Sequence, residues 1–170
     1  MAVVTVKSTG VTNATATPRV LNAANVASGN LRASQGMVAV ANGDSIGSTY
    51  RLFRLRSSDS VHALRLYCSA ITSAAADVGL YDIDTVNAGA VVDVDFFASA
   101  QSIASALAGT DISFEAGAAG GLLTNAEKRI WEALGLTADP FKEYDVTLTL
   151  TAAATAAGTV VLRCSHVSGE

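Results

Sequence analysis

Aromatic and charged side chains are scarce in this sequence. Phe, Tyr and Trp make up only 6% of the 170 residues, and Asp, Glu, Lys and Arg only 15%. Hydrophobic residues still account for 50%, so the apolar bulk comes from Ala, Val and Leu, with Thr and Ser beside them. Small and β-branched side chains of this kind pack well on pleated sheets. The composition therefore predicts one domain that is mainly β-structure.

Positive charge is scarcer than negative charge, with 11 Lys and Arg against 15 Asp and Glu and a net charge of −4. A nucleic-acid-binding protein needs the opposite balance, so free DNA or RNA is not expected as a partner. No stretch approaches the roughly 20 apolar residues of a membrane span, so no membrane partner is expected either. Residues 1–7 show no signal-peptide pattern, which indicates synthesis in the cytoplasm.

Cysteine and histidine number only two each. Cys68 and Cys164 form no CxxC unit, and we expect both to be reduced core residues. His62 and Cys68 fall on one face of a predicted strand but about 20 Å apart, too far to share an ion. Cys68, Cys164 and His166 could meet if their strands pair, but structural zinc normally has four closely spaced ligands. We therefore expect no metal or other cofactor.

Short runs with alternating apolar and polar residues follow one another along the chain. The predicted strands are Val3–Lys7, Gly36–Ala41, Thr49–Arg56, Val61–Ala70, Asp77–Ile83, Val91–Phe97, Glu143–Thr151 and Thr159–Val167. A strand over 91–97 would point Phe96 and Phe97 to opposite faces. Leu64–Ile83 and Asp145–Ser165 share one pattern of strand, Ala/Thr turn, Gly and strand, which predicts two hairpins. Several half-buried antiparallel strands at this spacing predict a sandwich or barrel.

Two helices and an arm complete the predicted organisation. Thr124 and Glu127 have the spacing of a capping box, and Gly135 supplies a stop, which predicts a helix between them. Ser99–Ala108 has apolar residues at helical spacing and predicts a second. Residues 1–34 have no useful periodicity after the first short strand, so we interpret them as an extended N-terminal arm, with a disordered terminus as the alternative. Residues 35–170 are the predicted sandwich domain.

One segment matches a catalytic motif. Gly43–Gly47, with Ser45 at its centre, has the G-x-S-x-G pattern of a nucleophile elbow, which requires a strand, a strained turn and a helix. Here the strand-like run Thr49–Arg56 follows instead of a helix. Lipase-like hydrolases also have an Asp three residues before a C-terminal His, and Arg163 occupies that place before His166. We therefore predict a tight turn and no enzymatic activity.

Charged side chains provide candidate subunit contacts. The basic candidates on two neighbouring strands are Arg51, Arg54, Arg56 and Arg65, and the acidic candidates around one predicted turn are Asp82, Asp84, Asp93 and Asp95. Arginine forms forked bonds to carboxylates, so the two groups would allow charge-complementary packing between copies. A solvated strand edge ranks ahead of that interpretation for the acidic group, and a Ca²⁺ site ranks behind it. For the arginines a solvated face is also the simpler alternative.

Several stretches resemble the capsid cement, or decoration, proteins of tailed bacteriophages, of the Bordetella podophage type. They are VTNATATPRVLNAANVASGNLRAS, VANGDSIGSTYRL, SAITSAAADVGLYD, GAVVDVDFFASA, WEALGLTADP and YDVTLTLTAAATAAGT. The resemblance covers nearly the whole chain and its motifs are structural. It implies a jelly-roll-like antiparallel β-sandwich, with no catalytic residues, bound to the outside of an HK97-type shell. There it would form dimers or other small oligomers that join adjacent major-capsid subunits of the expanded head.

A second interpretation is a head-fibre or receptor- or carbohydrate-binding jelly roll. Such a module would carry clustered exposed aromatic side chains, and this chain has one Trp and four Tyr.

Overall fold

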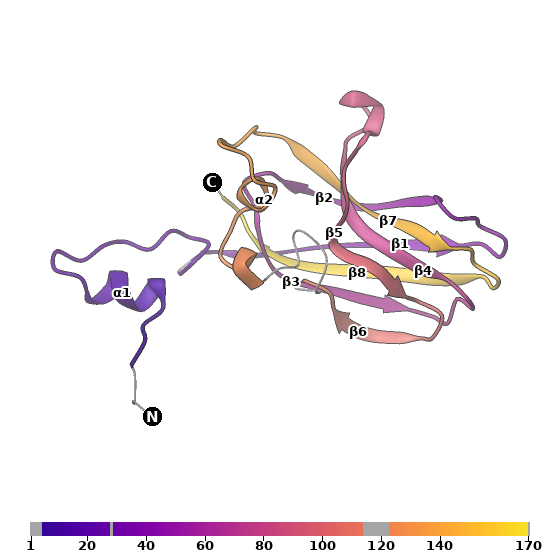
Figure 1. Ribbon diagram of the computed structural model, residues 1–170, viewed down its shortest axis with the longest axis horizontal. Coiled ribbons are helices and arrows are strands. Elements are labelled where there is room, and N and C mark those ends of the chain that lie inside the picture. Colours follow the sequence, from indigo (N-terminus) through magenta and orange to yellow (C-terminus); the bar gives the residue numbers. More distant parts are fainter. Residues whose placement is uncertain (1–4, 28, 114–122, 170) are drawn as a thin grey trace.

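The computed structural model describes residues 5–27, 29–113 and 123–169. These residues form eight strands in two four-stranded antiparallel sheets that pack face to face (Figure 1). The strands are β1 (Leu31–Val40), β2 (Thr49–Arg56), β3 (Ser60–Cys68), β4 (Ala75–Asp82), β5 (Val91–Ser102), β6 (Leu107–Asp111), β7 (Glu143–Ala152) and β8 (Gly158–Val167). We call the sheet with order β1-β8-β3-β6 sheet A and the sheet with order β2-β7-β4-β5 sheet B. The all-β sandwich is thus confirmed.

The strand order is that of an eight-stranded jelly roll. The chain moves from one sheet to the other at every connection except β4–β5. The two predicted hairpins are therefore wrong as hairpins. β3 pairs with β6 and β8, whereas β4 pairs with β5 and β7. β7 and β8 likewise lie in different sheets, because the Ala/Thr segments 69–74 and 153–157 span the gap between the sheets.

The helical content differs from the prediction. The predicted helix after Thr124 is replaced by a 3-10 turn η2 (Leu123–Asn125) and a single turn α2 (Ile130–Ala133). The backbone N–H groups of Ile130 and Trp131 donate to carbonyls of Asp59 and Ser57 in the β2–β3 connection, and these bonds replace the intrahelical ones. The capping box lies at Arg129 and Glu132, not at Thr124 and Glu127 as predicted. The carboxylate of Glu132 accepts from the backbone N–H of Arg129. The predicted stop at Gly135 is confirmed, with φ of 73°.

The predicted helix over Ser99–Ala108 is wrong, since β5 continues to Ser102 and β6 begins at Leu107. Ile103, at the bend between them, is fully buried. Its backbone N–H donates to the carbonyl of Ala74, and its carbonyl accepts from Ile71. Pairing with β4 before the bend and with β3 after it thus overrides the helical propensity of this Ala-rich segment.

β5 contains a large bulge opposite Gly79, which is also where the prediction for Phe96 and Phe97 is wrong. Val78 pairs with Ala98 but Leu80 pairs with Asp93, so several extra residues of β5 face one position of β4. A Cβ on Gly79 would lie 2.1 Å from the carbonyl oxygen of Asp93, so only glycine fits there. The bulge interrupts the alternation of side chains. Both phenylalanines are consequently buried, with ring centroids 4.8 Å apart in an edge-to-face contact.

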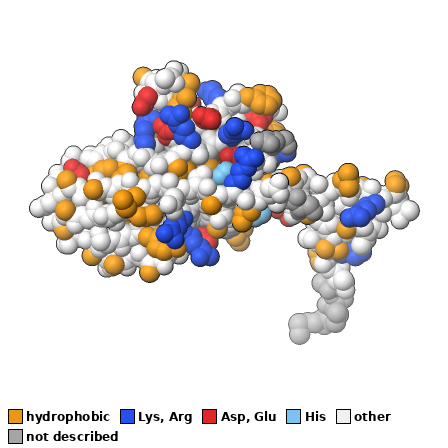
Figure 2. All heavy atoms as spheres, turned by 180° about the vertical axis from the view of Figure 1, so that it is seen from behind, with side chains coloured by type: hydrophobic (Ala, Val, Ile, Leu, Met, Phe, Trp, Pro, Cys, Tyr) orange, Lys and Arg blue, Asp and Glu red, His pale blue; other side chains and the backbone are white. Residues whose placement is uncertain are grey.

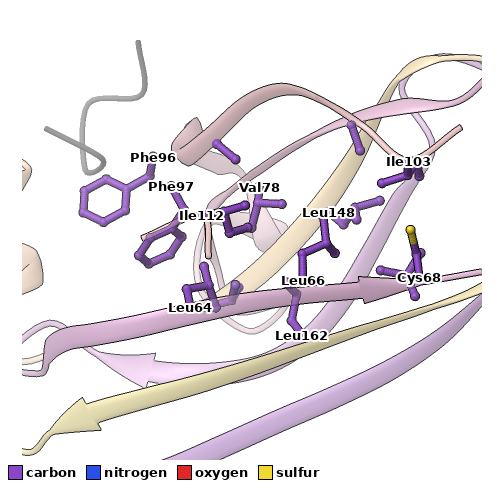
Figure 3. Packing of buried hydrophobic residues seen from close by; sticks show 14 of the residues in the cluster. Leu64, Leu66, Cys68, Val78, Phe96, Phe97, Ile103, Ile112, Leu148 and Leu162 are labelled. Atoms are coloured by element: carbon purple, nitrogen blue, oxygen red, sulfur yellow. The ribbon is translucent and has the colours of Figure 1, made fainter. Parts of the chain in front are cut away.

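The core lies between the sheets and is built mainly from aliphatic side chains of both sheets (Figure 3). Leu66 and Leu162 of sheet A face Val78 and Leu148 of sheet B, and all four are fully buried. The alternation predicted for residues 144–150 is confirmed for its inward side. The outward Thr147 is also fully buried, because β7 is a central strand of sheet B that other side chains cover.

The N-terminal segment lies beside one end of the sandwich (Figure 1). It contains a short helix, α1 (Thr9–Thr15), where the sequence predicted extended chain. No residue of α1 is buried. The helix therefore needs no apolar face, and the sequence has no apolar periodicity there that could predict a helix. Residues 5–7, the described part of the predicted strand Val3–Lys7, are not in a strand. Residues 31–34, assigned to the arm from the sequence, pair with β8.

Candidate interaction surfaces

A buried carboxylate organises the charges on the outer face of sheet B. Arg51 Nη1 donates to Asp145 Oδ2 over 2.7 Å, and Arg54 Nε donates to Asp145 Oδ1 over 2.8 Å. The Asp145 side chain is only 9% exposed, against 30% for Arg51 and 55% for Arg54. The hydrogen bond that Arg54 donates to Asp145 raises the pKa of Arg54. Two of the predicted basic candidates are therefore held by an acidic residue that the sequence analysis did not single out.

Arg51 also ties the β4–β5 connection to β2. Its guanidinium donates to the carbonyls of Asp82 and Gly89, both over 2.9 Å, and Nη2 lies 3.3 Å from Asp84 Oδ1. The carboxylate of Asp82 lies 3.6 Å from Lys142 Nζ. Predicted basic and acidic candidates thus meet within one chain. Whether they also contact other subunits stays a prediction.

Asp93 and Asp95 lie on the bulged strand β5 and interact with each other. The backbone N–H of Asp95 donates to Asp93 Oδ1 over 3.3 Å. Burial raises the pKa of Asp93, and the side chain of Asp95 raises it further, whereas the backbone bond from Asp95 acts in the opposite direction. In the described residues no group of three or more Asp, Glu, His or Cys side chains is placed to hold a metal ion. The hypothesis of a calcium site therefore gains no geometric support there.

The four predicted basic candidates do not form one cluster. Arg51, Arg54 and Arg56 belong to β2 in sheet B, whereas Arg65 belongs to β3 in sheet A. Arg56 is exposed, and its backbone N–H donates to Asp59 Oδ2. Arg65 is exposed on the opposite outer face of the sandwich. Strands that are neighbours in sequence are not neighbours in a sheet here, so sequence proximity did not bring the arginines together.

The Gly43–Gly47 segment is a turn between β1 and β2, as predicted. Both glycines have positive φ, 93° and 86°. Asp44 Oδ2 accepts from the backbone N–H of Ala41 and from the hydroxyl of Tyr50. These bonds lower the pKa of Asp44, while burial and the same carboxylate raise the pKa of Tyr50 to about 12. Ser45 is exposed and no helix follows it, so the geometry of a nucleophile elbow is absent from this turn.

Both cysteines are free and buried, as predicted. Burial raises the pKa of Cys68, and burial with the nearby Asp59 raises that of Cys164 to about 12, so both are unreactive thiols. The shared face predicted for His62 and Cys68 is wrong, since an irregularity between Val61 and Ala63 leaves His62 exposed while Cys68 is buried.

A buried polar row that the sequence analysis missed joins β1, β8 and the β2–β3 turn. His166 Nε2 lies 3.2 Å from Ser34 Oγ, and His166 Nδ1 lies 3.4 Å from Asp59 Oδ2. Burial lowers the pKa of His166, although Asp59 acts in the opposite direction. Ser34 stands within the β1–β8 ladder opposite Cys164, not at a turn that would present its hydroxyl. We interpret the row as a structural network.

No protein-family model matches the chain, and no curated protein matches its sequence. Among solved structures, the fold is similar to a chain described as "Cyanophage Pam1 capsid asymmetric unit". The TM-score is 0.52 and the sequence identity 15%, over 82% of this chain and 86% of that chain. At this identity the similarity establishes a shared fold. In the described part of the chain no helix is long and apolar enough to cross a membrane.

Proposed function

We propose that this chain is a non-enzymatic cement, or decoration, protein of a tailed bacteriophage capsid. It binds the outside of an HK97-type shell and joins adjacent major-capsid subunits of the expanded head, as a dimer or another small oligomer. The proposal is supported by a jelly roll similar in fold to a chain of a phage capsid. The observation that carries it is the N-terminal arm, whose helix buries nothing in the sandwich.

The arm has internal order but lacks a core of its own. Asn13 Nδ2 donates to Asn22 Oδ1 over 2.8 Å, and Asn22 Nδ2 donates to the carbonyl of Gly10 over 3.2 Å. Val6 and Leu21 are each 86% exposed. Burying such side chains stabilises an assembly by roughly 1.5–3 kcal/mol each. A neighbouring subunit that covers the arm would supply that burial.

A second candidate contact is the connection between α2 and β7. Phe141 is 89% exposed and has a positive φ of 52°, an uncommon backbone conformation for an aromatic residue. Asp139 accepts from the backbone N–H of Phe141. The hydroxyl of Ser57 donates to the carboxylate of Asp139 and accepts from the backbone N–H of Lys142. The sandwich therefore holds an aromatic side chain out in solvent. Exposed aromatic residues often become anchors of protein interfaces.

The proposed mechanism is mechanical. Packaged DNA pushes the capsid subunits apart, and a protein that binds only across their junction stabilises the closed shell by its binding free energy. Modest affinity at each contact suffices when one oligomer engages more than one subunit. No bond is made or broken in this mechanism, so no catalytic group is required.

The test uses expanded heads of the phage that carries this protein, assembled without it. We expect the full-length protein to sediment with expanded heads and not with isolated major-capsid subunits, because one subunit offers only part of the binding site. Removing residues 1–20 should weaken binding at least tenfold while the truncated protein still melts cooperatively. A matched control is Lys128→Gln, a change of one exposed charge on the sandwich.

The two parts of the proposal fail separately. If the full-length protein does not bind expanded heads, the cement function is wrong and a receptor- or carbohydrate-binding module takes its place. If the truncated protein binds as tightly as the full chain, the arm is not the contact and the sandwich holds the shell alone.

A further inference from the structure

Two arginines stand directly opposite each other on the outer face of sheet A. Arg65 of β3 pairs with Arg163 of β8 in the antiparallel register. Directly opposite side chains on neighbouring strands have Cβ atoms about 5 Å apart, and like charges there are destabilising. Folding alone therefore disfavours this pair.

Neither charge is neutralised within the described part of the chain. There, neither arginine forms an ion pair with a carboxylate, in contrast to Arg51 and Arg54 on sheet B. Asp111 of β6 lies opposite Arg65 in the register, but its carboxylate accepts from the backbone N–H and the hydroxyl of Ser113. The guanidinium of Arg163 instead lies over the ring of Tyr67, 5.1 Å from the centroid. Among the described residues, two cations thus stand side by side with no carboxylate paired to either.

The surface around the pair suits a protein contact. Arg65 and Arg163 line a shallow concavity together with Ala63, Tyr67 and Ser165. On the neighbouring edge strand β1, Met37 is 72% exposed, and it faces Val161 of β8 in the register. Arginine, tyrosine and methionine are enriched at the centres of protein interfaces. The small side chains between them leave the concavity open to a partner.

We propose that this face of sheet A, which we call the Arg65/Arg163 face, docks on a carboxylate-bearing surface of the major capsid protein. The inference rests on the proposed cement function and names the chemistry of the contact. A partner surface with two or more Asp or Glu side chains would supply the counter-charges for the two guanidiniums, in forked contacts that apolar neighbours shield from water.

Two other occupants fit the charges less well. A second copy related by a two-fold axis would place the Arg65/Arg163 face against itself and bring four cations together, which charge repulsion opposes. Nucleic acid requires a tract of basic side chains along its backbone. On the face seen in Figure 2, basic side chains form separate small groups, several with acidic neighbours, and no continuous tract.

The experiment measures binding of five proteins to expanded heads assembled without this chain. They are the wild type, Arg65→Gln, Arg163→Gln, the double variant and the control Lys128→Gln. We expect the double variant to bind at least tenfold more weakly and the control to remain within twofold of the wild type. Wild-type binding should weaken with rising NaCl, and binding of the double variant should depend less on salt. Each free protein is also melted, and the melting temperature of the double variant should not fall below that of the wild type, because the double variant relieves a like-charge contact.

A geometric role is separated from a simple charge effect by Arg65→Lys with Arg163→Lys. This variant keeps both charges but loses the planar forks, and we expect intermediate binding. If wild type binds heads and the double variant binds equally well, the inference is overturned while the cement function stands. Loss of self-association, or of binding to a duplex DNA probe, in the double variant would assign the face to a second copy or to nucleic acid and also overturn it. If wild type does not bind heads, both proposals fail.

Discussion

Replacing Asp145 by asparagine tests whether the charge network on sheet B stabilises the fold. Asparagine keeps the size of the side chain and one carbonyl acceptor but removes the charge that Arg51 and Arg54 share. The bond from Arg51 to Asp145 is 2.7 Å long, and the carboxylate is 9% exposed. A hydrogen bond to a charged group contributes about 1.5–3 kcal/mol net. We therefore expect Asp145→Asn to lower the free energy of unfolding by about 2–3 kcal/mol.

The assay is thermal and urea denaturation followed by circular dichroism. For a domain of this size each 1 kcal/mol corresponds to roughly 2–4 °C in melting temperature, so a fall of about 4–12 °C is expected. Arg51→Gln should lower the free energy of unfolding at least as much. It also removes the hydrogen bonds to the carbonyls of Asp82 and Gly89, and it leaves Asp145 without its closest partner. Arg54→Gln is the matched control, because Arg54 is 55% exposed and should matter less.

Two results would refute this reasoning. Asp145→Asn could melt within about 2 °C of the wild type, which would mean that desolvation of the carboxylate cancels the benefit of its bonds. Alternatively, Arg54→Gln could destabilise as strongly as Arg51→Gln, which would show that the contacts of Arg51 to the β4–β5 connection contribute little.

Three further predictions concern the core, the buried histidine and the turn. Leu148→Asp places a charge at a fully buried position and should unfold the domain, whereas Thr159→Asp on the exposed side of β8 should melt like wild type. Because burial lowers the pKa of His166 in the folded protein, the unfolded chain binds its proton first as pH falls below about 6.5. Stability should therefore be complete above that pH and decline below it, and His166→Gln should flatten this decline in urea titrations at several pH values, with His62→Gln as the control. Ser45→Ala should change neither stability nor hydrolysis of a nitrophenyl ester, and ester turnover that disappears in this variant would revive the hydrolase interpretation.

The strands were largely predictable because alternation is a local signal. The prediction for Thr49–Arg56 matches β2 at both ends, and that for Glu143–Thr151 ends one residue before β7 does. Alternation states which side chains point inward, but it does not state which strand lies beside which. Leu64–Ile83 reads as a hairpin because both of its strands alternate, although they belong to opposite sheets. β6 was missed because its short run LAGTD has almost no apolar alternation.

The charge network could not be predicted for the same reason. Arg51 and Asp145 are 94 residues apart, and only the β2–β7 pairing brings them together. The sequence grouped Arg65 with Arg51 because their strands follow each other, whereas the jelly roll sends those strands to opposite sheets. Ser34, Asp59 and His166 likewise meet through pairings between distant strands. Alternation along β8 places Cys164 and His166 on its buried side, but it does not identify their partners.

Strand β1 connects the two proposed contacts. The arm enters the sandwich at Leu31, the first residue of β1, and this side chain is 63% exposed. Leu31, Gln35 and Met37 share one face of that strand because side chains of alternate residues point the same way, and Gln35 lies opposite Arg163 in the register. In the proposed complex, a capsid subunit that covered the arm would also lie along β1 beside the Arg65/Arg163 face. Two contacts joined by a short rigid strand raise each other's effective concentration, so neither has to be strong alone. Removing both contacts should therefore reduce binding by the product of the two factors measured when each contact is removed alone.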